Sequence, residues 1–170
     1  MAETMVRMGE LAASAGVADV LVSLGLGSCI GLALVDRRTG VAGLAHVVLP
    51  ASEGHAAGQN PFKFADHAVP ELINRVVRLG GLKPKLEAVL VGGASMFAIT
   101  SRTLEVGQRN EAAVRTLLKT LRIPVLAAET GGNRGRTIRV HLDTMRITVR
   151  QAGGSERDLL KPSRQLAVVA

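Results

Sequence analysis

The chain has 170 residues and a net charge of +7, and its aromatic residues are three Phe with no Tyr or Trp. This length suits one domain, residues 1–170, with a single aliphatic core. No stretch approaches the roughly 18 consecutive apolar residues of a membrane span, no signal segment opens the chain, and one cysteine excludes an internal disulfide; we therefore expect a cytoplasmic protein without membrane insertion.

The basic excess lies entirely in the second part of the chain. Residues 1–100 carry 8 Lys/Arg and 8 Asp/Glu, whereas residues 101–170 carry 13 and 6. Such a surface either binds an acidic partner or is simply a solvated face. Nucleic acid is not expected as the partner, because the chain lacks the stacking aromatic residues that single-strand and RNA readers use.

The first half of the chain has the pattern of strands joined by short turns. Val20–Leu24 is predicted to be a strand and is followed by the glycine-rich segment Gly25–Cys29. Two more apolar runs, Ile30–Val35 and Val41–Leu49, flank Asp36-Arg-Arg-Thr-Gly40. An Asp at the start and a Gly at the end are typical of a turn, so this segment predicts a β-hairpin.

The second half adds two helices and more strands. Apolar residues at helical spacing predict one helix from Phe64 to Leu79 and another from about Asn110 to Leu121. The further predicted strands are Leu86–Val91, Val125–Ala128, Arg136–Leu142 and Met145–Gln151, the last two forming a hairpin. The tail after about residue 153 is expected to be loosely packed. This pattern favours an α+β fold, a layered sandwich of mixed or antiparallel sheet with two main helices on one side.

The glycine-rich segment Gly25-Leu-Gly-Ser-Cys29 carries the one cysteine of the chain. It begins like a dinucleotide-binding fingerprint, but Ile30 replaces the third glycine and a strand follows instead of a helix, which excludes that interpretation. Glycines let a turn aim successive backbone N–H groups at one point. Such donors could stabilise the oxyanion that forms when a thiolate attacks an amide. Alternatively, Cys29 is a small buried apolar residue.

A cysteine nucleophile needs a base, because a free thiol is mostly protonated at neutral pH. His46 is the candidate, since it lies in an apolar strand that would normally exclude it. The other three histidines fall in a loop, a first helical turn and a basic strand: His55, His67 and His141. A hairpin register in which paired residue numbers sum to about 76 places Cys29 opposite Val47, next to His46. The alternative for His46 is a hydrogen-bonded core histidine, and no histidine–cysteine spacing matches a zinc site.

A third group usually orients such a histidine. The sequence offers four candidates, Ser23, Thr39, Asp66 and Asp143. Each can form a hydrogen bond, and spacing does not choose among them.

Five sequence blocks together resemble the chemoreceptor glutamine deamidase family, CheD. The blocks are Leu24–Cys29, Ala45–Pro50, Gly92–Phe97, Gly107–Asn110 and Thr130–Arg134. The resemblance implies hydrolysis of glutamine side chains on chemotaxis receptors to glutamate and ammonia, without a metal or cofactor. It implies that Cys29 is the nucleophile and His46 the general base. Ser23 lies where the family usually has a threonine that orients the histidine.

The same resemblance implies a mechanism and partners. His46 would take the proton of Cys29, and backbone N–H groups around Gly27 and Ser28 would hold the oxyanion. Arg134 and Arg136 could steer acidic receptor helices toward the site. The family is similar in layered architecture to glutamine-deamidating toxins, and in some bacteria its members bind CheC, a phosphatase. The alternative function is therefore a non-catalytic or dual-role binding module that regulates a CheC-type phosphatase.

Overall fold

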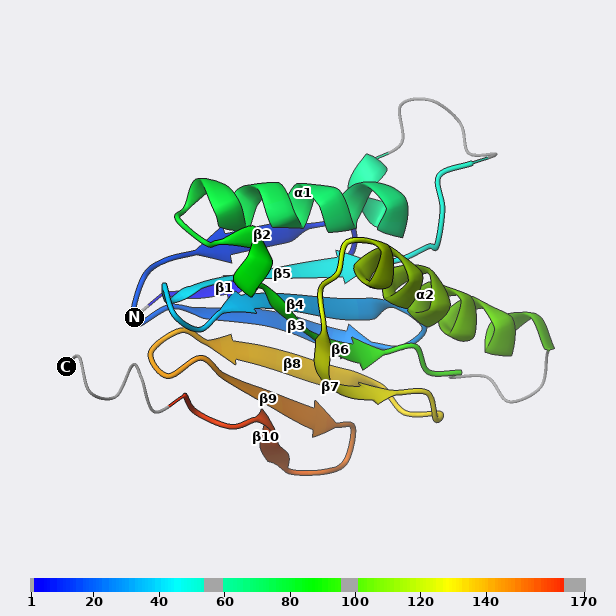
Figure 1. Ribbon diagram of the computed structural model, residues 1–170. Helices are drawn as coiled ribbons and strands as arrows, with labels where there is room; N and C mark the ends of the chain where they lie inside the picture. The colour runs from blue at the N-terminus through cyan, green and yellow to red at the C-terminus, as the bar shows by residue number, and fades with distance from the viewer. Residues whose placement is uncertain (1, 54–59, 96–100, 164–170) are drawn as a thin grey trace.

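The computed structural model describes residues 2–53, 60–95 and 101–163, and two five-stranded sheets and two α-helices form this part of the chain (Figure 1). The outer sheet has the order β1 (Glu3–Met5), β3 (Val20–Leu26), β8 (Arg136–His141), β9 (Arg146–Gln151) and β10 (Glu156–Leu160). The central sheet has the order β2 (Leu11–Ser14), β5 (Val41–Val47), β4 (Ile30–Asp36), β6 (Glu87–Gly92) and β7 (Val125–Thr130). The helices are α1 (Ala65–Arg78) and α2 (Ser101–Thr120), and the 3₁₀ turns are Pro61–Lys63 and Lys83–Lys85.

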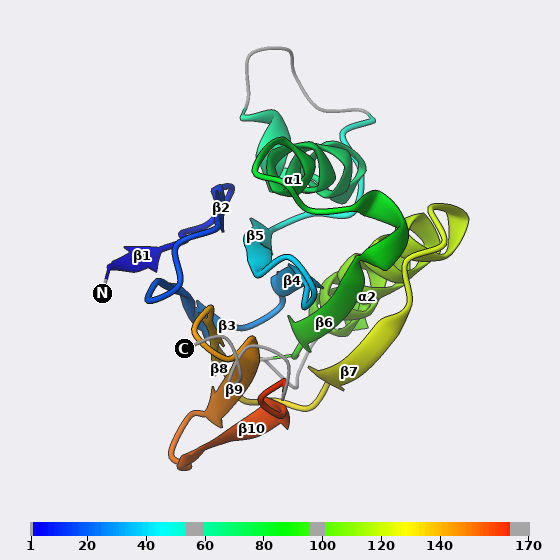
Figure 2. The same cartoon turned by 60° about the vertical axis from the view of Figure 1, so that its left-hand side comes forward.

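The central sheet is covered on both faces. Helices α1 and α2 lie on one face and the outer sheet packs on the other (Figure 2). Side chains of β4 alternate between the two cores: Leu32 and Leu34 pack toward the helices, whereas Ala33 and Val35 pack toward the outer sheet. All seven residues of β4 are therefore buried, which explains its nearly continuous apolar sequence. The predicted α+β fold with both helices on one side is confirmed.

The two helices differ in how well the sequence predicted their bounds. Helix α1 has its predicted position, but α2 begins at Ser101 rather than near Asn110. Gly107 obscured the earlier start, because a glycine within a helix costs stability. A Cβ on Gly107 would lie 2.6 Å from the carbonyl oxygen of Gly93. The glycine is thus needed where the helix packs against the chain that leaves β6.

Three strands were missed by the sequence analysis: β1, β2 and β10. Each has only three to five residues and lies at the edge of a sheet, so its alternation is too short to detect. The tail after about residue 153, which was expected to be loosely packed, contains β10; this strand pairs antiparallel with β9, and three of its five residues are exposed. In the part of the chain that the structure describes, no helix is long and apolar enough to cross a membrane.

The predicted hairpin forms between β4 and β5, with its turn after Asp36. Its paired residue numbers sum to 77 rather than 76, so Ile30 pairs with Val47 and Gly31 with His46. The predicted register was therefore wrong by one residue. Extending the observed register by one position puts Cys29 opposite Val48, two residues from His46 and not one.

Candidate active site

Cys29 lies where the chain crosses from the outer sheet to the central sheet. Strand β3 ends in a bulge between Ser23 and Leu26, where Gly25 adopts a φ of +62° that favours glycine. Residues 27–29 then form the crossing, and β4 starts directly after Cys29. The Cys29 side chain is 9% exposed, so it lies at the edge of the core between the sheets.

The segment that follows β6 holds the crossing in place. The backbone N–H of Gly93 donates to the carbonyl of Cys29 at 2.9 Å, and that of Ala94 donates to Gly27 at 2.8 Å. Gly92 has a φ of +118°, and a Cβ at this position would overlap the carbonyl oxygen of Cys29. The glycines that end β6 therefore allow its backbone to approach the Cys29 backbone closely.

The register places His46 and Cys29 on the same face of the central sheet. Gly31 is directly opposite His46, and Cys29 precedes Gly31 by two residues, which is one full period of a strand. The leucine side chain of Leu26 fills the space beside Gly31, where a Cβ would lie 2.7 Å from its Cδ1. The shifted register thus brings the two side chains to one face as diagonal neighbours.

The hydrogen bonding of His46 defines its tautomer. Its Nδ1 lies 3.2 Å from the carbonyl oxygen of Val6. A carbonyl only accepts, so Nδ1 carries the proton and Nε2 keeps its lone pair. Nε2 is buried and has no hydrogen-bond partner in the described part of the chain. The imidazole is therefore oriented with Nε2 as its proton-accepting atom.

Burial favours the neutral form of both His46 and Cys29. It lowers the pKa of His46, and the Val6 hydrogen bond and the charge of Glu10 oppose this only in part. Burial likewise raises the pKa of the Cys29 thiol, opposed by its own backbone N–H. The resting pair near neutral pH is consequently a thiol and a neutral imidazole, and a thiolate requires proton transfer.

Ser23 acts on His46 only through Val6. Its hydroxyl donates to the Val6 carbonyl oxygen at 2.7 Å, the same atom that accepts from His46. The other three candidates for this role have different partners: Thr39 pairs with Asp36, Asp66 with Ser52, and Asp143 with Thr144. The sequence analysis missed Val6, because its contribution is a backbone carbonyl that no residue type signals.

Asn110 of α2 joins the two strands that carry the pair. Its Nδ2 donates to the carbonyls of Ser28 and Val48, both at 2.9 Å. These residues precede Cys29 and follow His46 in their segments, so one buried amide fixes their separation. Asn110 lies in one of the five sequence blocks that resemble the CheD family. Its contacts, however, depend on how α2 packs against the sheet, which the sequence does not specify.

The other histidines have separate partners. His67 in α1 bonds to Ser52, and His141 in β8 bonds to Thr148. His55 lies outside the described residues. His46 is thus the histidine that the described structure brings to the Cys29 face.

Comparison with known proteins gives the family of the chain. The family model described as CheD chemotactic sensory transduction matches residues 48–151. A Clostridium kluyveri protein named "Probable chemoreceptor glutamine deamidase CheD" is 42% identical over 142 residues, covering 82% of this chain and 88% of the relative. A Clostridium botulinum (strain Hall) protein of the same name is 40% identical over 143 residues, covering 83% and 88%. This chain belongs to the CheD family.

The family resemblance inferred from the five sequence blocks is thereby confirmed. The family model's match begins at Val48, after Cys29 and His46, so it does not include these two residues. Among solved structures, the Neisseria meningitidis protein NMB0706 of the DUF152 family is 10% identical with a TM-score of 0.46, covering 78% of this chain and 63% of that protein.

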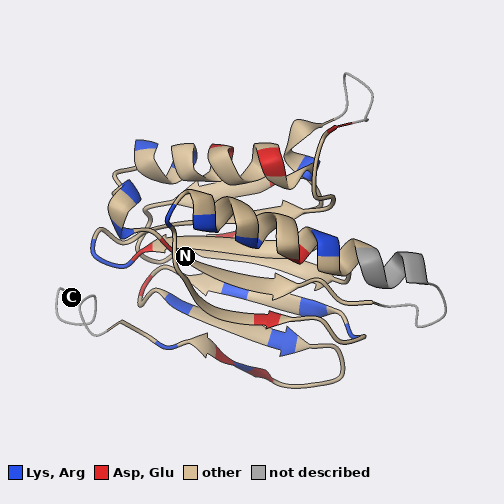
Figure 3. Cartoon of the chain, turned by 45° about the vertical axis from the view of Figure 1, so that its right-hand side comes forward, with Lys and Arg blue, Asp and Glu red and all other residues tan. Residues whose placement is uncertain are grey.

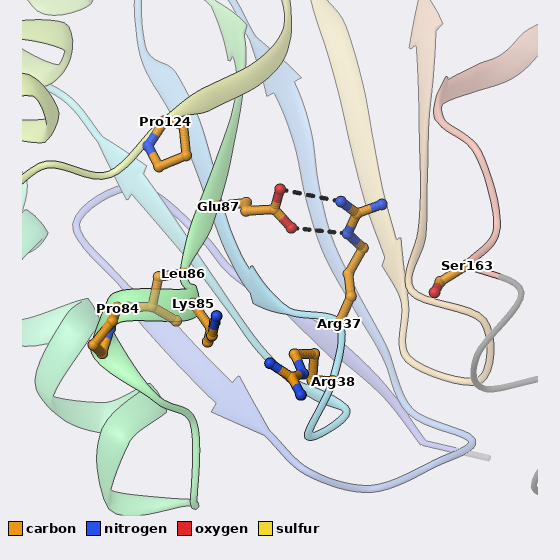
Figure 4. A pocket seen from close by; sticks show the side chains of 8 residues that line it. All are labelled: Arg37, Arg38, Pro84, Lys85, Leu86, Glu87, Pro124 and Ser163. Carbon is orange, nitrogen blue, oxygen red and sulfur yellow. Dashed lines mark hydrogen bonds and ion pairs between the residues drawn. The ribbon is translucent and has the colours of Figure 1, made fainter.

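In this CheD-family chain, a cavity lies at each end of the β4–β5 hairpin. A cavity of about 480 Å³ lies at the turn end, where Arg37 and Glu87 form a two-bond ion pair (Figure 4). A cavity of about 360 Å³ lies at the other end and is lined by Met5, Val6, Arg7, Met8, Leu24 and His46. Of these two cavities, the smaller is the one that reaches His46.

Some arginines of the second half pair with acidic residues inside the outer sheet, whose strands carry both charges (Figure 3). Ion pairs link Arg139 to Glu156 and Arg146 to Asp158. Arg136 is only 6% exposed and pairs with Glu129 at 3.2 Å. The interpretation of Arg136 as a steering residue is therefore wrong: its charge is buried and paired. Arg134 is exposed.

Proposed function

We propose that this chain is a protein-glutamine deamidase that converts glutamine side chains of chemoreceptors to glutamate and releases ammonia. The observation that carries the proposal is the unpartnered Nε2 of His46 on the Cys29 face, with its tautomer set by Val6. Membership in a family whose curated relatives are named chemoreceptor glutamine deamidases supplies the substrate class.

The reaction begins with proton transfer from the Cys29 thiol to Nε2 of His46. The thiolate forms a bond to the amide carbon of the glutamine, and the C–N bond then breaks as His46 returns the proton to the departing ammonia. His46 next accepts a proton from water, whose oxygen attacks the thioester. The S–C bond breaks, glutamate leaves, and the thiol regains its proton.

The oxyanion is assigned to the crossing between β3 and β4. The carbonyls of Gly27, Ser28 and Cys29 all accept hydrogen bonds from Ala94, Asn110 and Gly93. In contrast, no backbone N–H of these three residues donates to another backbone carbonyl of the described part. The N–H groups around Gly27 and Ser28 are thus the donors left for a developing negative charge, an effect typically of about 3–4 kcal/mol per donor.

Ser23 is assigned a positioning role. By donating to the Val6 carbonyl, its hydroxyl fixes the oxygen that orients His46. A threonine could provide the same bond, since it also carries a hydroxyl on Cβ.

The test is to incubate a receptor cytoplasmic fragment with this protein and with Cys29→Ala, and to map the products by peptide mass spectrometry. Site-specific conversion of glutamine to glutamate, lost in Cys29→Ala at unchanged thermal stability, is the expected result. Conversion by Cys29→Ala would disprove the nucleophile. No conversion by the wild-type protein would favour the alternative, a binding module for a CheC-type phosphatase.

A further inference from the structure

We propose that the cavity in front of His46, here called the N-terminal cleft, binds the receptor residues that flank the target glutamine. The cleft is lined by Met5, Val6, Arg7, Met8, Leu24 and His46. Its occupant is an amphipathic receptor segment that carries an apolar side chain beside the glutamine and a carboxylate within reach of Arg7. This inference rests on the proposed function and extends it by stating which receptor glutamines the site selects.

The cleft is continuous with His46 of the proposed Cys29–His46 pair. His46 is 4% exposed, and its ring forms part of the cleft wall. Val6, whose carbonyl orients His46, forms the adjacent wall. A glutamine side chain that reaches His46 through the cleft leaves its neighbouring residues at the rim.

The rim of the cleft exposes apolar side chains. Met8 is 63% exposed and Leu24 is 49% exposed. They come from separate segments, the one following β1 and the bulged end of β3, yet they border the same cleft. Burying such side chains against a partner is favourable, and a methionine adapts its shape to different partners. The rim therefore suits an apolar residue next to the glutamine.

Arg7 adds an exposed positive charge to the cleft. Its backbone N–H donates to the Glu10 carboxylate, but within residues 2–53, 60–95 and 101–163 no carboxylate pairs with its guanidinium. Arg37, Arg75 and Arg115, by comparison, each pair with a glutamate. An exposed, unpaired guanidinium beside apolar side chains complements a peptide that presents a carboxylate near its apolar residue.

The experiment compares charge substitutions at the rim with matched substitutions elsewhere. Met8→Asp and Leu24→Asp should each lower kcat/KM for the receptor fragment by about tenfold or more, mainly through KM. Val17→Asp and Leu82→Asp change equally exposed apolar residues outside the cleft, 73% and 52% exposed, and should stay within about twofold of wild type.

Arg7 is tested by a charge swap. Arg7→Glu should reduce conversion most at glutamines that have a glutamate within one helical turn. Replacing that receptor glutamate by lysine should restore conversion by Arg7→Glu and weaken conversion by the wild-type protein, because the attractive pair is re-formed with opposite signs.

Alkylation of Cys29 by iodoacetamide, which needs no receptor contact, shows whether the catalytic pair is intact. The expected result is an alkylation rate within about twofold of wild type for each rim variant. Wild-type kcat/KM in Met8→Asp and Leu24→Asp would overturn the inference, as would a loss of activity that a parallel loss of alkylation explains. Wild-type protein that converts no glutamine would overturn the proposed function itself, and the inference with it.

Discussion

The two ends of the β4–β5 hairpin are built from the same strands but differ in how their polar groups are paired. At the turn end, the Asp36 carboxylate accepts from the backbone N–H groups of Arg38, Thr39 and Leu82, and Arg37 binds Glu87 through two hydrogen bonds of 2.9 and 3.0 Å. At the other end, about 20 Å away along seven residues of β4, the Nε2 of His46 and the Oδ1 of Asn110 are buried without a partner in the described structure.

Unpaired buried groups and cavity size point to different ends of the hairpin. Leaving a buried polar atom without a hydrogen bond costs about 1–3 kcal/mol, so a folded protein keeps such atoms where they serve a purpose. The turn end has the larger cavity, yet its charged groups already satisfy one another. Burial acts to raise the pKa of Asp36, but its hydrogen bonds outweigh burial and hold that pKa below its usual value.

The largest effect should come from removing the base. His46→Gln should lower kcat by about 10²- to 10⁴-fold. Wild-type kcat/KM should fall on acidification, because protonated His46 cannot accept the thiol proton. Since the pKa of His46 is lowered by burial, the fall should be centred below the usual value of about 6.5. His67→Gln is the matched control and should keep the wild-type pH profile; a profile centred well above 6.5 would contradict the neutral pair.

The next largest effect is expected from substitution of Gly92, which should lower the free energy of unfolding. Gly80→Ala and Gly92→Ala both place a Cβ at similar positive φ, +107° and +118°, but only the latter meets the Cys29 backbone, whereas Gly80 has open space. We expect Gly80→Ala to cost about 1 kcal/mol, and Gly92→Ala to cost about 1–3 kcal/mol more because of overpacking. Urea unfolding measures the difference. Equal losses in the two variants would mean that the approach to Cys29 relaxes freely.

Asn110→Ala should have an intermediate effect, at the end of the hairpin that carries Cys29 and His46. It removes the donor to Ser28 and Val48 and should destabilise the fold by about 1–3 kcal/mol, with a fall in kcat larger than any change in KM. Gln108→Ala, an exposed position on the same helix, is the control for both readouts. Full stability with reduced kcat would mean that Asn110 acts mainly by positioning Cys29, whereas full activity would exclude that role.

The smallest effect is expected at the turn end. Arg37→Ala removes an ion pair whose side chains are 34% and 23% exposed, so it should cost less than about 1 kcal/mol of stability. Deamidation of the receptor fragment should be unchanged. A tenfold loss of activity in Arg37→Ala would instead show that the two ends of the hairpin are coupled.

The sequence predicted those features that depend on local patterns. Apolar runs and turn residues predicted the hairpin, and helical spacing predicted α1. The start of α2 could not be predicted, because Gly107 is explained only by its contact with Gly93. The register was wrong by one residue, since turn composition does not fix how many residues the turn contains.

The sequence predicted which side chains belong to the candidate site, but not the hydrogen bonds that position them. Cys29 and His46 could be selected because a glycine-rich turn and an apolar strand make them unusual. The contacts of Val6 and Asn110 bring together residues 40 or more positions apart. Arg136 was misread because the sequence gives its charge, whereas its burial against Glu129 depends on how two strands from different sheets meet.

The Val6 carbonyl has a consequence for how this site varies through evolution. The atom that orients His46 belongs to the main chain, so any residue that keeps the backbone path at position 6 supplies it equally well. A buried apolar side chain is the only demand that packing places there. In aligned sequences, position 6 should therefore vary among aliphatic residues. The contact that sets the tautomer of His46 would then not be visible as a conserved residue.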